Sequence, residues 1–281
     1  LTLAASITPK VLTESGLSVA ASRVYNGTTS TSILGSAALA TTETAGSGNT
    51  SDGKPYSGDT VSITGTPVGT YNDAHVVNAS TVTFSGLSLT GAQASNYSLT
   101  IQSPASATIT AATITPTITN TGVTKVYDGT LSSSITPTYT IAGLISGDTI
   151  TLSNTSIAYN DPNVSLASRV TVSGLSISAV TATTHNSATT DYVLDASSHY
   201  VNASISPATV TLVATKVYDG TPNLTSVIIG GLVGSQTLTY TGATANNAHV
   251  ATASKGQDTQ QKRTAQTAEH VHGDLRGRAG D

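Results

Sequence analysis

The sequence predicts an all-β protein built from tandem β-sandwich repeats. Three observations support this fold class: the composition, a long internal repeat, and alternating apolar residues within the repeat. About a third of the 281 residues are Ser or Thr, 37% are hydrophobic and only 9% are charged. Thr, Val and Ile favour strands because branching at Cβ restricts their first side-chain torsion. Disorder accompanies low hydrophobicity and high charge, so this composition favours a folded β protein.

The composition also excludes several classes of protein. The chain has no Cys, which rules out a disulfide scaffold, a thiolate metal site and a cysteine nucleophile. A net charge of -4 provides no basic footprint for nucleic acid. No apolar run approaches the ~18 residues of a membrane span, and no signal peptide is recognisable. We therefore expect no nucleic-acid partner and no membrane span in this segment. Because Met is absent, we also expect the chain to be a fragment of a longer one.

The internal repeat is marked by a six-residue block. The sequence K-V-Y-D-G-T begins at Lys125 and again at Lys216, and the variant R-V-Y-N-G-T begins at Arg23. Successive copies are therefore 102 and 91 positions apart. The coils of a solenoid repeat every ~20–30 residues, whereas a β-sandwich domain needs about 100. The period favours tandem sandwiches over a solenoid.

Other landmarks define the repeat boundaries because they keep the same order in each copy. They are G-D-T from Gly58 and Gly147, Y-N-D from Tyr71 and Tyr159, G-L-S from Gly86 and Gly174, and N-Y or D-Y from Asn96 and Asp191. We predict the end of a preceding repeat at 1–9, a first sandwich at 10–113, a second at 114–204, a truncated third repeat at 205–254 and a disordered tail at 255–281.

The first repeat is longer than the second, and its extra residues at 41–57 predict a surface loop or an added hairpin. The charged tail lacks strand alternation, and one hypothesis is that a frameshift produced it from Lys255 onward.

Alternating apolar residues predict the strands. Val82 and Phe84 alternate, and Leu87 and Leu89 then alternate in the opposite phase, with Gly86 at the shift. A Gly at a phase shift predicts a β-bulge that keeps the apolar side chains facing the core. Further strands are expected at Val61–Ile63, Thr108–Thr110, Ile150–Leu152, Val201–Ile205, Val210–Val213 and Leu238–Tyr240. About seven short strands per repeat fit an elongated series of immunoglobulin-like sandwiches, and no segment has helical periodicity.

The ordered landmarks resemble the YDG domain. That repeat occurs in large secreted bacterial proteins of the filamentous-haemagglutinin-like adhesin type, alongside the related MBG repeats. The resemblance rests on the K-V-Y-D-G-T block, then G-D-T, S-G-L-S-L, N-Y-x-L and a closing A-T-I-T, and it covers about residues 7–253. It implies an extracellular, bacterial, multi-repeat protein with no catalytic residues and no cofactor.

The Tyr-Asp-Gly block has a structural interpretation and a metal-binding alternative. Asp-Gly favours a tight turn, since Gly adopts positive φ and Asp bonds the local backbone, while the Tyr ring is expected to be buried. The predicted turn residues are Tyr25, Asn26 and Gly27, then Tyr127, Asp128 and Gly129, and finally Tyr218, Asp219 and Gly220. The alternative is a calcium site formed by Asp128, Asp148 and Asp161. Calcium takes six to eight oxygens, and one repeat offers few carboxylates, so we favour the turn.

No motif in the chain indicates catalysis. None of the six histidines has a metal-binding spacing, and no nucleophile elbow is present. We therefore expect a non-catalytic, structural stalk segment of an adhesin on the bacterial cell surface, whose partners are the neighbouring repeats of a longer chain. The alternative is an extracellular binding module whose repeats recognise a host-surface glycan or a host matrix protein.

Overall fold

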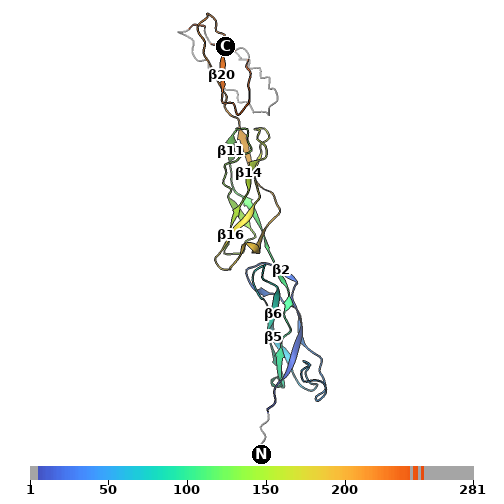
Figure 1. The fold of residues 1–281 in the computed structure, drawn as a ribbon. Coiled ribbons are helices and arrows are strands. Elements are labelled where there is room, and N and C mark those ends of the chain that lie inside the picture. The colour runs from blue at the N-terminus through green and yellow to red at the C-terminus, as the bar shows by residue number, and fades with distance from the viewer. Residues whose placement is uncertain (1–5, 241–242, 246–247, 250–281) are drawn as a thin grey trace, which may run out of the picture. The chain divides into compact units, whose positions relative to one another are not determined.

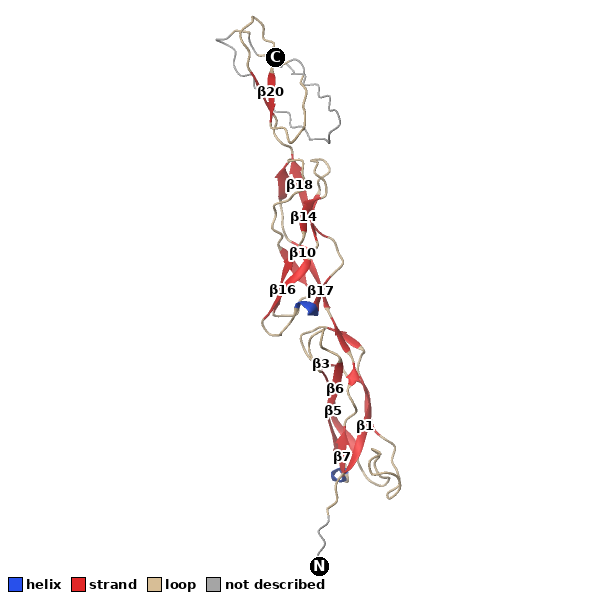
Figure 2. Cartoon of the chain, viewed as in Figure 1, coloured by secondary structure: helices blue, strands red, loops and turns tan. Residues whose placement is uncertain are grey.

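The computed structural model describes residues 6–240, 243–245 and 248–249 (Figure 1). This part of the chain is all-β apart from two single-turn 3-10 helices, η1 (Ala94–Asn96) and η2 (Thr189–Asp191) (Figure 2). The predicted class of all-β repeats is confirmed. The predicted tail at 255–281 lies outside the described residues, as do the first five residues of the predicted preceding repeat.

The chain divides into two compact units that do not coincide with the predicted repeats. Unit 1 consists of Leu1–Thr115, Ile141–Leu152 and Ser176–Asp195, and unit 2 of Pro116–Thr140, Ser153–Leu175 and Ala196–Asp281. Unit 1 therefore combines the first repeat with two stretches of the second. Unit 2 combines the rest of the second repeat with the start of the third.

Most strands of unit 1 come from the first repeat. They are β1 (Lys10–Ser18), β2 (Ser22–Val24), β3 (Ser30–Thr31), β4 (Leu34–Leu39), β5 (Ser62–Tyr71), β6 (Thr81–Thr90), β7 (Tyr97–Thr100), β8 (Ala105–Ser106) and β9 (Thr108–Thr110). The second repeat adds β13 (Asp148–Ser153), β16 (Ser176–Ala182) and β17 (Tyr192–Leu194) to this unit. The division falls within β10 (Ala112–Ile118) and β12 (Tyr139–Ala142), and just before the last residue of β13.

Unit 2 contains the other strands of the second repeat and those of the third. They are β11 (Val123–Val126), β14 (Ser156–Tyr159), β15 (Arg169–Ser173), β18 (His199–Ser206), β19 (Thr211–Ala214) and β20 (Val227–Gly230). The expected strand at Leu238–Tyr240 does not form, and β19 pairs antiparallel with β20 instead. The Tyr240 hydroxyl accepts a hydrogen bond from the Val227 N–H at 3.2 Å.

The two repeats share a pattern of strand pairing. In the first, β1 pairs parallel with β7 and β2 pairs parallel with β9. In the second, β10 pairs parallel with β17 and β11 pairs parallel with β18. The sheet β3-β5-β6-β8 is antiparallel throughout. In the sheet β11-β18-β15-β14, the ladders that join β18, β15 and β14 are antiparallel. A strand from the start of each repeat thus lies beside a strand from its end.

A bulge occurs at the level of Gly86, as predicted, but its extra residue lies on the partner strand. The register between β5 and β6 shifts so that Thr66 and Pro67 of β5 face the single Gly86, which has a φ of +85°. A Cβ at Gly86 would lie 2.3 Å from the carbonyl oxygen of Thr66. At the matching Gly174, with φ +63°, the strand is interrupted between β15 and β16. Only glycine adopts these backbone angles without strain.

Each unit has its own hydrophobic core. The core of unit 1 contains Val82 and Ile109 from the first repeat, and Ile114 and Tyr192 from the second. The core of unit 2 contains Val123, Tyr127, Tyr159, Val170 and Ile205. One continuous core in unit 1 therefore joins residues from two sequence repeats, which is the packing basis of the division.

The excess residues of the first repeat form a loop without strands. Residues 41–57 contain two isolated bridges, between Glu43 and Tyr56 and from Leu12 to Gly53. These contacts attach the loop to the start of β1. The structure thus shows a surface loop here and not an added hairpin.

Candidate functional site: the repeated Tyr-Asp-Gly turn

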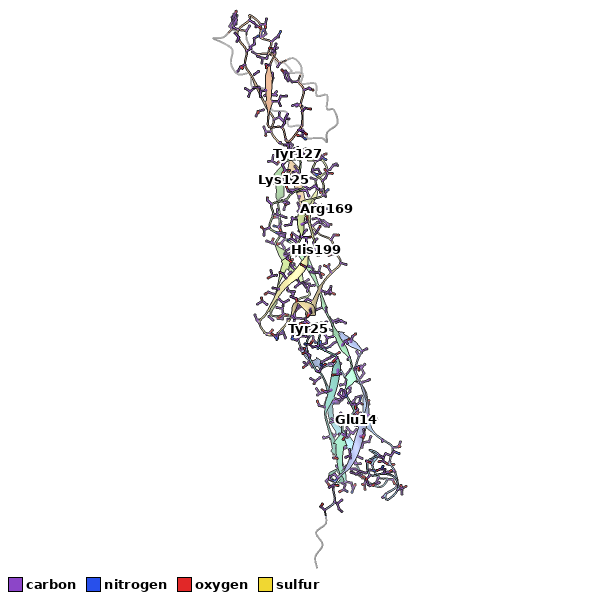
Figure 3. All side chains as sticks on the ribbon, viewed as in Figure 1. Glu14, Tyr25, Lys125, Tyr127, Arg169 and His199 are labelled. Carbon is purple, nitrogen blue, oxygen red and sulfur yellow. The ribbon has the colours of Figure 1, made fainter. Side chains whose placement is uncertain are left out.

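The turn of the second repeat is closed by one lysine, Lys125, which is labelled with Tyr127 in Figure 3. Lys125 Nζ donates hydrogen bonds to Asp128 Oδ1 at 2.7 Å, to the Thr130 carbonyl at 2.7 Å and to the Ser132 carbonyl at 3.0 Å. Asp128 Oδ1 also accepts the Thr130 N–H at 2.9 Å, and Gly129 has a φ of +73°. The predicted use of Asp as a local backbone acceptor and of Gly at positive φ is confirmed.

The third copy of the turn has the same internal geometry. Lys216 Nζ donates to the Thr221 carbonyl at 2.7 Å and to the Asn223 carbonyl at 2.8 Å, and it pairs with Asp219 at 2.6 Å. Asp219 Oδ1 accepts the Thr221 N–H at 2.9 Å, and Gly220 has a φ of +74°. The turn forms in the same way although the third repeat is truncated.

In the first copy, arginine and asparagine replace lysine and aspartate. Arg23 donates one hydrogen bond to Asn26 Oδ1 at 2.6 Å and another to the Thr28 carbonyl. Asn26 Oδ1 accepts the Thr28 N–H at 3.1 Å, and Gly27 has a φ of +77°. The hydrogen-bond geometry is kept, but a neutral amide stands where the other copies have a carboxylate.

Each lysine lowers the pKa of its neighbouring carboxyl group. The hydrogen bond from Lys125 lowers the pKa of Asp128 to about 2, and Lys216 lowers that of Asp219 to about 2. Both acids are therefore ionised at neutral pH. Arg23 faces no such carboxylate, and burial lowers the pKa of its guanidinium.

In the first and second repeats, the cation of the turn lies over the tyrosine ring of the Y-N-D landmark. The guanidinium carbon of Arg23 lies 5.0 Å from the centroid of the Tyr71 ring, and Lys125 Nζ lies 5.1 Å from that of Tyr159. Both distances are within the range of a cation–π interaction. Two landmarks that are distant in the sequence thus form one structural element in each full repeat.

The turn tyrosines differ strongly in burial. Tyr25 is 2% exposed and Tyr127 is 7% exposed, whereas Tyr218 is 57% exposed. Within unit 1, the Tyr25 hydroxyl is 2.7 Å from Ser187 Oγ of the second repeat. Within unit 2, the Tyr127 hydroxyl accepts a hydrogen bond from Gln236 Nε2 of the third repeat at 2.7 Å. The expected burial of the tyrosine is confirmed for the first two copies and is wrong for the third.

Other residues of unit 1 strengthen the contact around Tyr25. Its ring stacks on His75, with a centroid separation of 6.4 Å, and meets the edge of Tyr192 at 5.7 Å. Asp191, which is fully buried, accepts hydrogen bonds from His75 Nδ1 at 2.7 Å and from the Val76 N–H at 2.9 Å. The first repeat therefore binds the second through a polar network as well as through the shared core.

The G-D-T landmark is linked to the tyrosine near the end of each repeat. The Tyr97 hydroxyl donates to Asp59 Oδ2 at 2.6 Å, and the Tyr192 hydroxyl donates to Asp148 Oδ2 at 2.5 Å. Burial, followed by the hydrogen bond to Asp148, raises the pKa of Tyr192 above its ordinary value. These tyrosines therefore remain protonated donors, which is a structural role.

The three acids of the calcium alternative have separate local partners. Asp128 binds its own lysine, Asp148 accepts the tyrosine hydroxyl described above, and Asp161 Oδ1 accepts the Asn163 N–H at 2.7 Å. Among the described residues, no three His, Asp or Glu side chains are grouped so that they could hold a metal ion. The three aspartates of the calcium alternative are therefore not grouped as metal ligands among the described residues. The turn interpretation accounts for the position of Asp128.

The residues that hydrogen-bond to the turn tyrosines were not predicted from the sequence. Ser187 and Gln236 are distant from Tyr25 and Tyr127 in the sequence and do not occupy matching positions in their repeats. The Asp191 pairing with His75 spans 116 positions. Only the recurrence of D-Y and N-Y near the end of each repeat marked this region.

The fold and the turn define an all-β protein of tandem, mutually contacting repeats. The YDG domain matches residues 8–107 and again residues 110–199, and the chain belongs to this family. Searches of curated proteins and of solved structures found no match. Within the residues that the structure describes, no helix has the length and apolar character to cross a membrane.

Proposed function

We propose that the chain is a non-catalytic, structural repeat segment of a bacterial adhesin that is secreted or exposed on the cell surface. Its role is to hold successive YDG domains together so that they act as a spacer for a binding region elsewhere in a longer protein. The filamentous-haemagglutinin-like adhesins, with their related MBG repeats, are the class of protein to which we assign it.

One observation carries this proposal. The hydroxyl groups of Tyr25 and Tyr127, which belong to the motif that defines the family, each bond a residue of the following repeat. In each case the ring is also buried. A motif engaged in this way is unavailable to a ligand and connects domains, as expected of a stalk.

An array of immobilised glycans and host matrix proteins, probed with the full chain, tests the proposal. We expect no specific binding, and we expect Tyr25→Ala to weaken the association of the first two repeats, measured by hydrogen exchange in Ser187–Leu194. Specific and saturable binding to an arrayed glycan or matrix protein would contradict the stalk and support a binding module.

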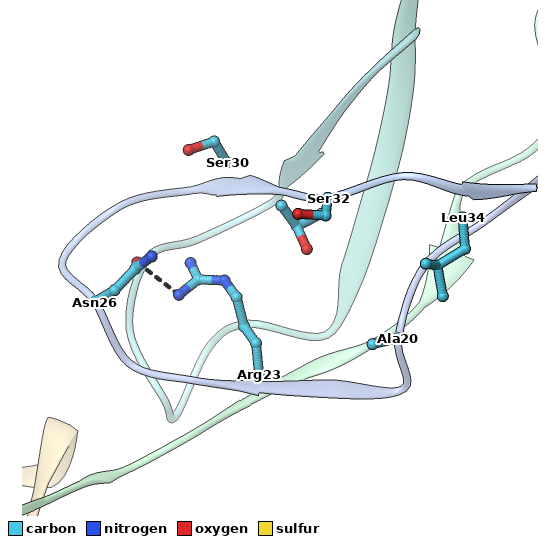
Figure 4. A pocket seen from close by; sticks show the side chains of 7 residues that line it. Ala20, Arg23, Asn26, Ser30, Ser32 and Leu34 are labelled. Carbon is cyan, nitrogen blue, oxygen red and sulfur yellow. Dashed lines mark hydrogen bonds between the residues drawn. The ribbon is translucent and has the colours of Figure 1, made fainter.

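A hollow beside the first turn supports the binding module as a second candidate (Figure 4). It has a volume of about 500 Å³ and is lined by Ala20, Arg23, Asn26, Ser30, Thr31, Ser32 and Leu34. Its guanidinium and hydroxyl groups suit a glycan that carries a carboxylate. If this hollow is a glycan site, filling it by Ser32→Tyr abolishes the binding seen on the array. The matched change Ser134→Tyr, in the second repeat, leaves that binding intact.

A further inference from the structure

The start of β1 carries a buried lysine between two carboxyl groups. Lys10 Nζ contacts Glu43 Oε1 and lies 3.0 Å from Asp52 Oδ1. The three side chains are 7%, 12% and 20% exposed, respectively. Lys10 Nζ also lies 4.3 Å from the centroid of the Tyr56 ring. These groups are therefore largely shielded from water, unlike the lysine–aspartate pairs of the turns.

Backbone contacts fix both carboxyl groups against β1. The Glu43 N–H donates to the Pro55 carbonyl at 2.9 Å, and the Thr13 N–H donates to the Gly53 carbonyl at 3.2 Å. Gly53 has a φ of +76°, and a Cβ there would lie 2.6 Å from Thr13 Oγ1. The loop is thus held in close contact with the strand, and the reacting groups are positioned before any reaction.

The two carboxyl groups also lie close to each other. A Cβ at Gly48 would lie 2.1 Å from Glu43 Oε2 and 3.3 Å from Asp52 Oδ2. One ammonium group and two carboxyl groups are therefore in mutual contact. A lysine amine beside a carboxyl group is the reactant pair for amide formation, and the second carboxyl group is in position to relay protons between them.

We propose that Lys10 and Asp52 become joined by an intramolecular amide bond. The lone pair of the deprotonated Lys10 Nζ forms a bond to Asp52 Cγ, and the bond from Cγ to one carboxyl oxygen breaks. That oxygen leaves as water with the two protons that Nζ loses. The ammonium and carboxylate thus give one amide and one water, with no change in oxidation state and no co-reactant.

The contacts assign different roles to the two acids. The Lys54 N–H donates to Asp52 Oδ1 at 3.1 Å, in the position to stabilise the oxyanion that forms when Nζ attacks. The same N–H and then Lys10 lower the pKa of Asp52 to about 2, against the opposing effect of burial. Asp52 therefore requires a proton from a neighbour during the reaction. Glu43, which contacts Lys10 Nζ and lies beside Asp52, carries the proton between them.

The turn of the second repeat is an internal control. Lys125 Nζ lies 2.7 Å from Asp128 Oδ1, closer than the 3.0 Å that separates Lys10 Nζ from Asp52 Oδ1. Its aspartate side chain is 48% exposed, however, and no second carboxyl group contacts the lysine. Water stabilises the charged form of this pair, so we expect no amide bond there.

The intact mass of the full chain under denaturing conditions tests the proposal. We expect a mass lower than that of the sequence by one water, and fragmentation should locate a branched peptide that joins Lys10 to Asp52. Lys10→Arg and Asp52→Ala should restore the full mass, and Glu43→Gln should greatly slow the loss of water. Circular dichroism of each variant shows whether it retains its β structure, while the wild-type measurement is independent of variant folding.

Several outcomes would overturn the assignment. The wild-type chain could keep its full mass after days at neutral pH, or Asp52→Ala could still lose water through a link from Lys10 to Glu43. A link at Lys125 would show that proximity alone suffices and that the shielded pair of acids has no special role.

Discussion

The first and third copies of the Tyr-Asp-Gly turn have the same internal hydrogen bonds but different surroundings. In both, a basic side chain reaches the carbonyl of the threonine that ends the block, at Thr28 and at Thr221. Yet Tyr25 is 2% exposed and Tyr218 is 57% exposed. The difference shows that six residues encode the turn locally, whereas burial of the tyrosine depends on contacts with the following repeat.

The largest expected effect comes from removing the buried tyrosine. Tyr25→Ala should lower the free energy of unfolding of unit 1 by about 3–5 kcal/mol, because it leaves a cavity in the core and an unpaired Ser187. Tyr218→Ala should change stability by less than about 0.5 kcal/mol, because this ring is exposed. Urea denaturation of the two variants measures the comparison, and equal effects would show that the third turn is buried in solution.

A smaller loss is expected at the polar network of unit 1. Asp191→Ala should destabilise the protein by about 3 kcal/mol, since it leaves the Val76 N–H without its buried acceptor. Asn96 occupies the matching position in the first repeat and is exposed. Asn96→Ala is therefore the control, with an expected effect below about 0.5 kcal/mol by the same urea measurement. A negligible loss for Asp191→Ala would mean that water replaces the carboxylate.

Substitution of the turn glycines separates local strain from packing. Gly27 and Gly220 have similar φ values, +77° and +74°. A Cβ at Gly27 would lie 2.6 Å from His185 Cδ2, whereas Gly220 faces open space. Gly220→Ala should therefore cost about 1 kcal/mol of backbone strain, and Gly27→Ala about 2 kcal/mol because the clash adds to it. Thermal unfolding of both variants checks this order, and equal losses of stability would mean that backbone strain alone decides the effect.

The smallest effect is the pH dependence of stability that the turns with aspartate contribute. The pKa of Asp128 is lowered to about 2 by Lys125, so its contribution to stability is complete above pH ~4 and is lost as the pH falls towards 2. The side chain is half exposed, which limits this contribution to below about 1 kcal/mol. Asp128→Asn, which places the amide of the first turn in the second turn, should remove the share of Asp128 in the change of denaturant midpoint between pH 5 and 2. An unchanged pH profile would contradict this assignment.

Features set by neighbouring residues could be predicted from the sequence. The Asp-Gly pairs identified the turns, and the phase shift at Gly86 identified the bulge, since both depend on backbone angles that glycine alone adopts easily. The repeated landmarks identified the YDG family because their order extends over most of the chain. These signals are local or periodic, so a single sequence displays them.

Contacts between distant residues could not be predicted in this way. Lys10 meets Glu43 and Asp52 across a loop whose length gives no indication of its path. Tyr25 hydrogen-bonds to a serine and Tyr127 to a glutamine. These two partners do not occupy matching positions in their repeats, so the repeat pattern could not predict them. The compact units also differ from the sequence repeats, because packing joins side chains from two successive copies.

The parallel pairing of early and late strands has a mechanical consequence. Within the first repeat, β2 runs parallel to β9, and in the second repeat β11 runs parallel to β18. When opposite ends of a repeat are pulled apart, two parallel strands slide past each other along their length. The hydrogen bonds between the two strands are then loaded in shear, so they must break together and not one after another.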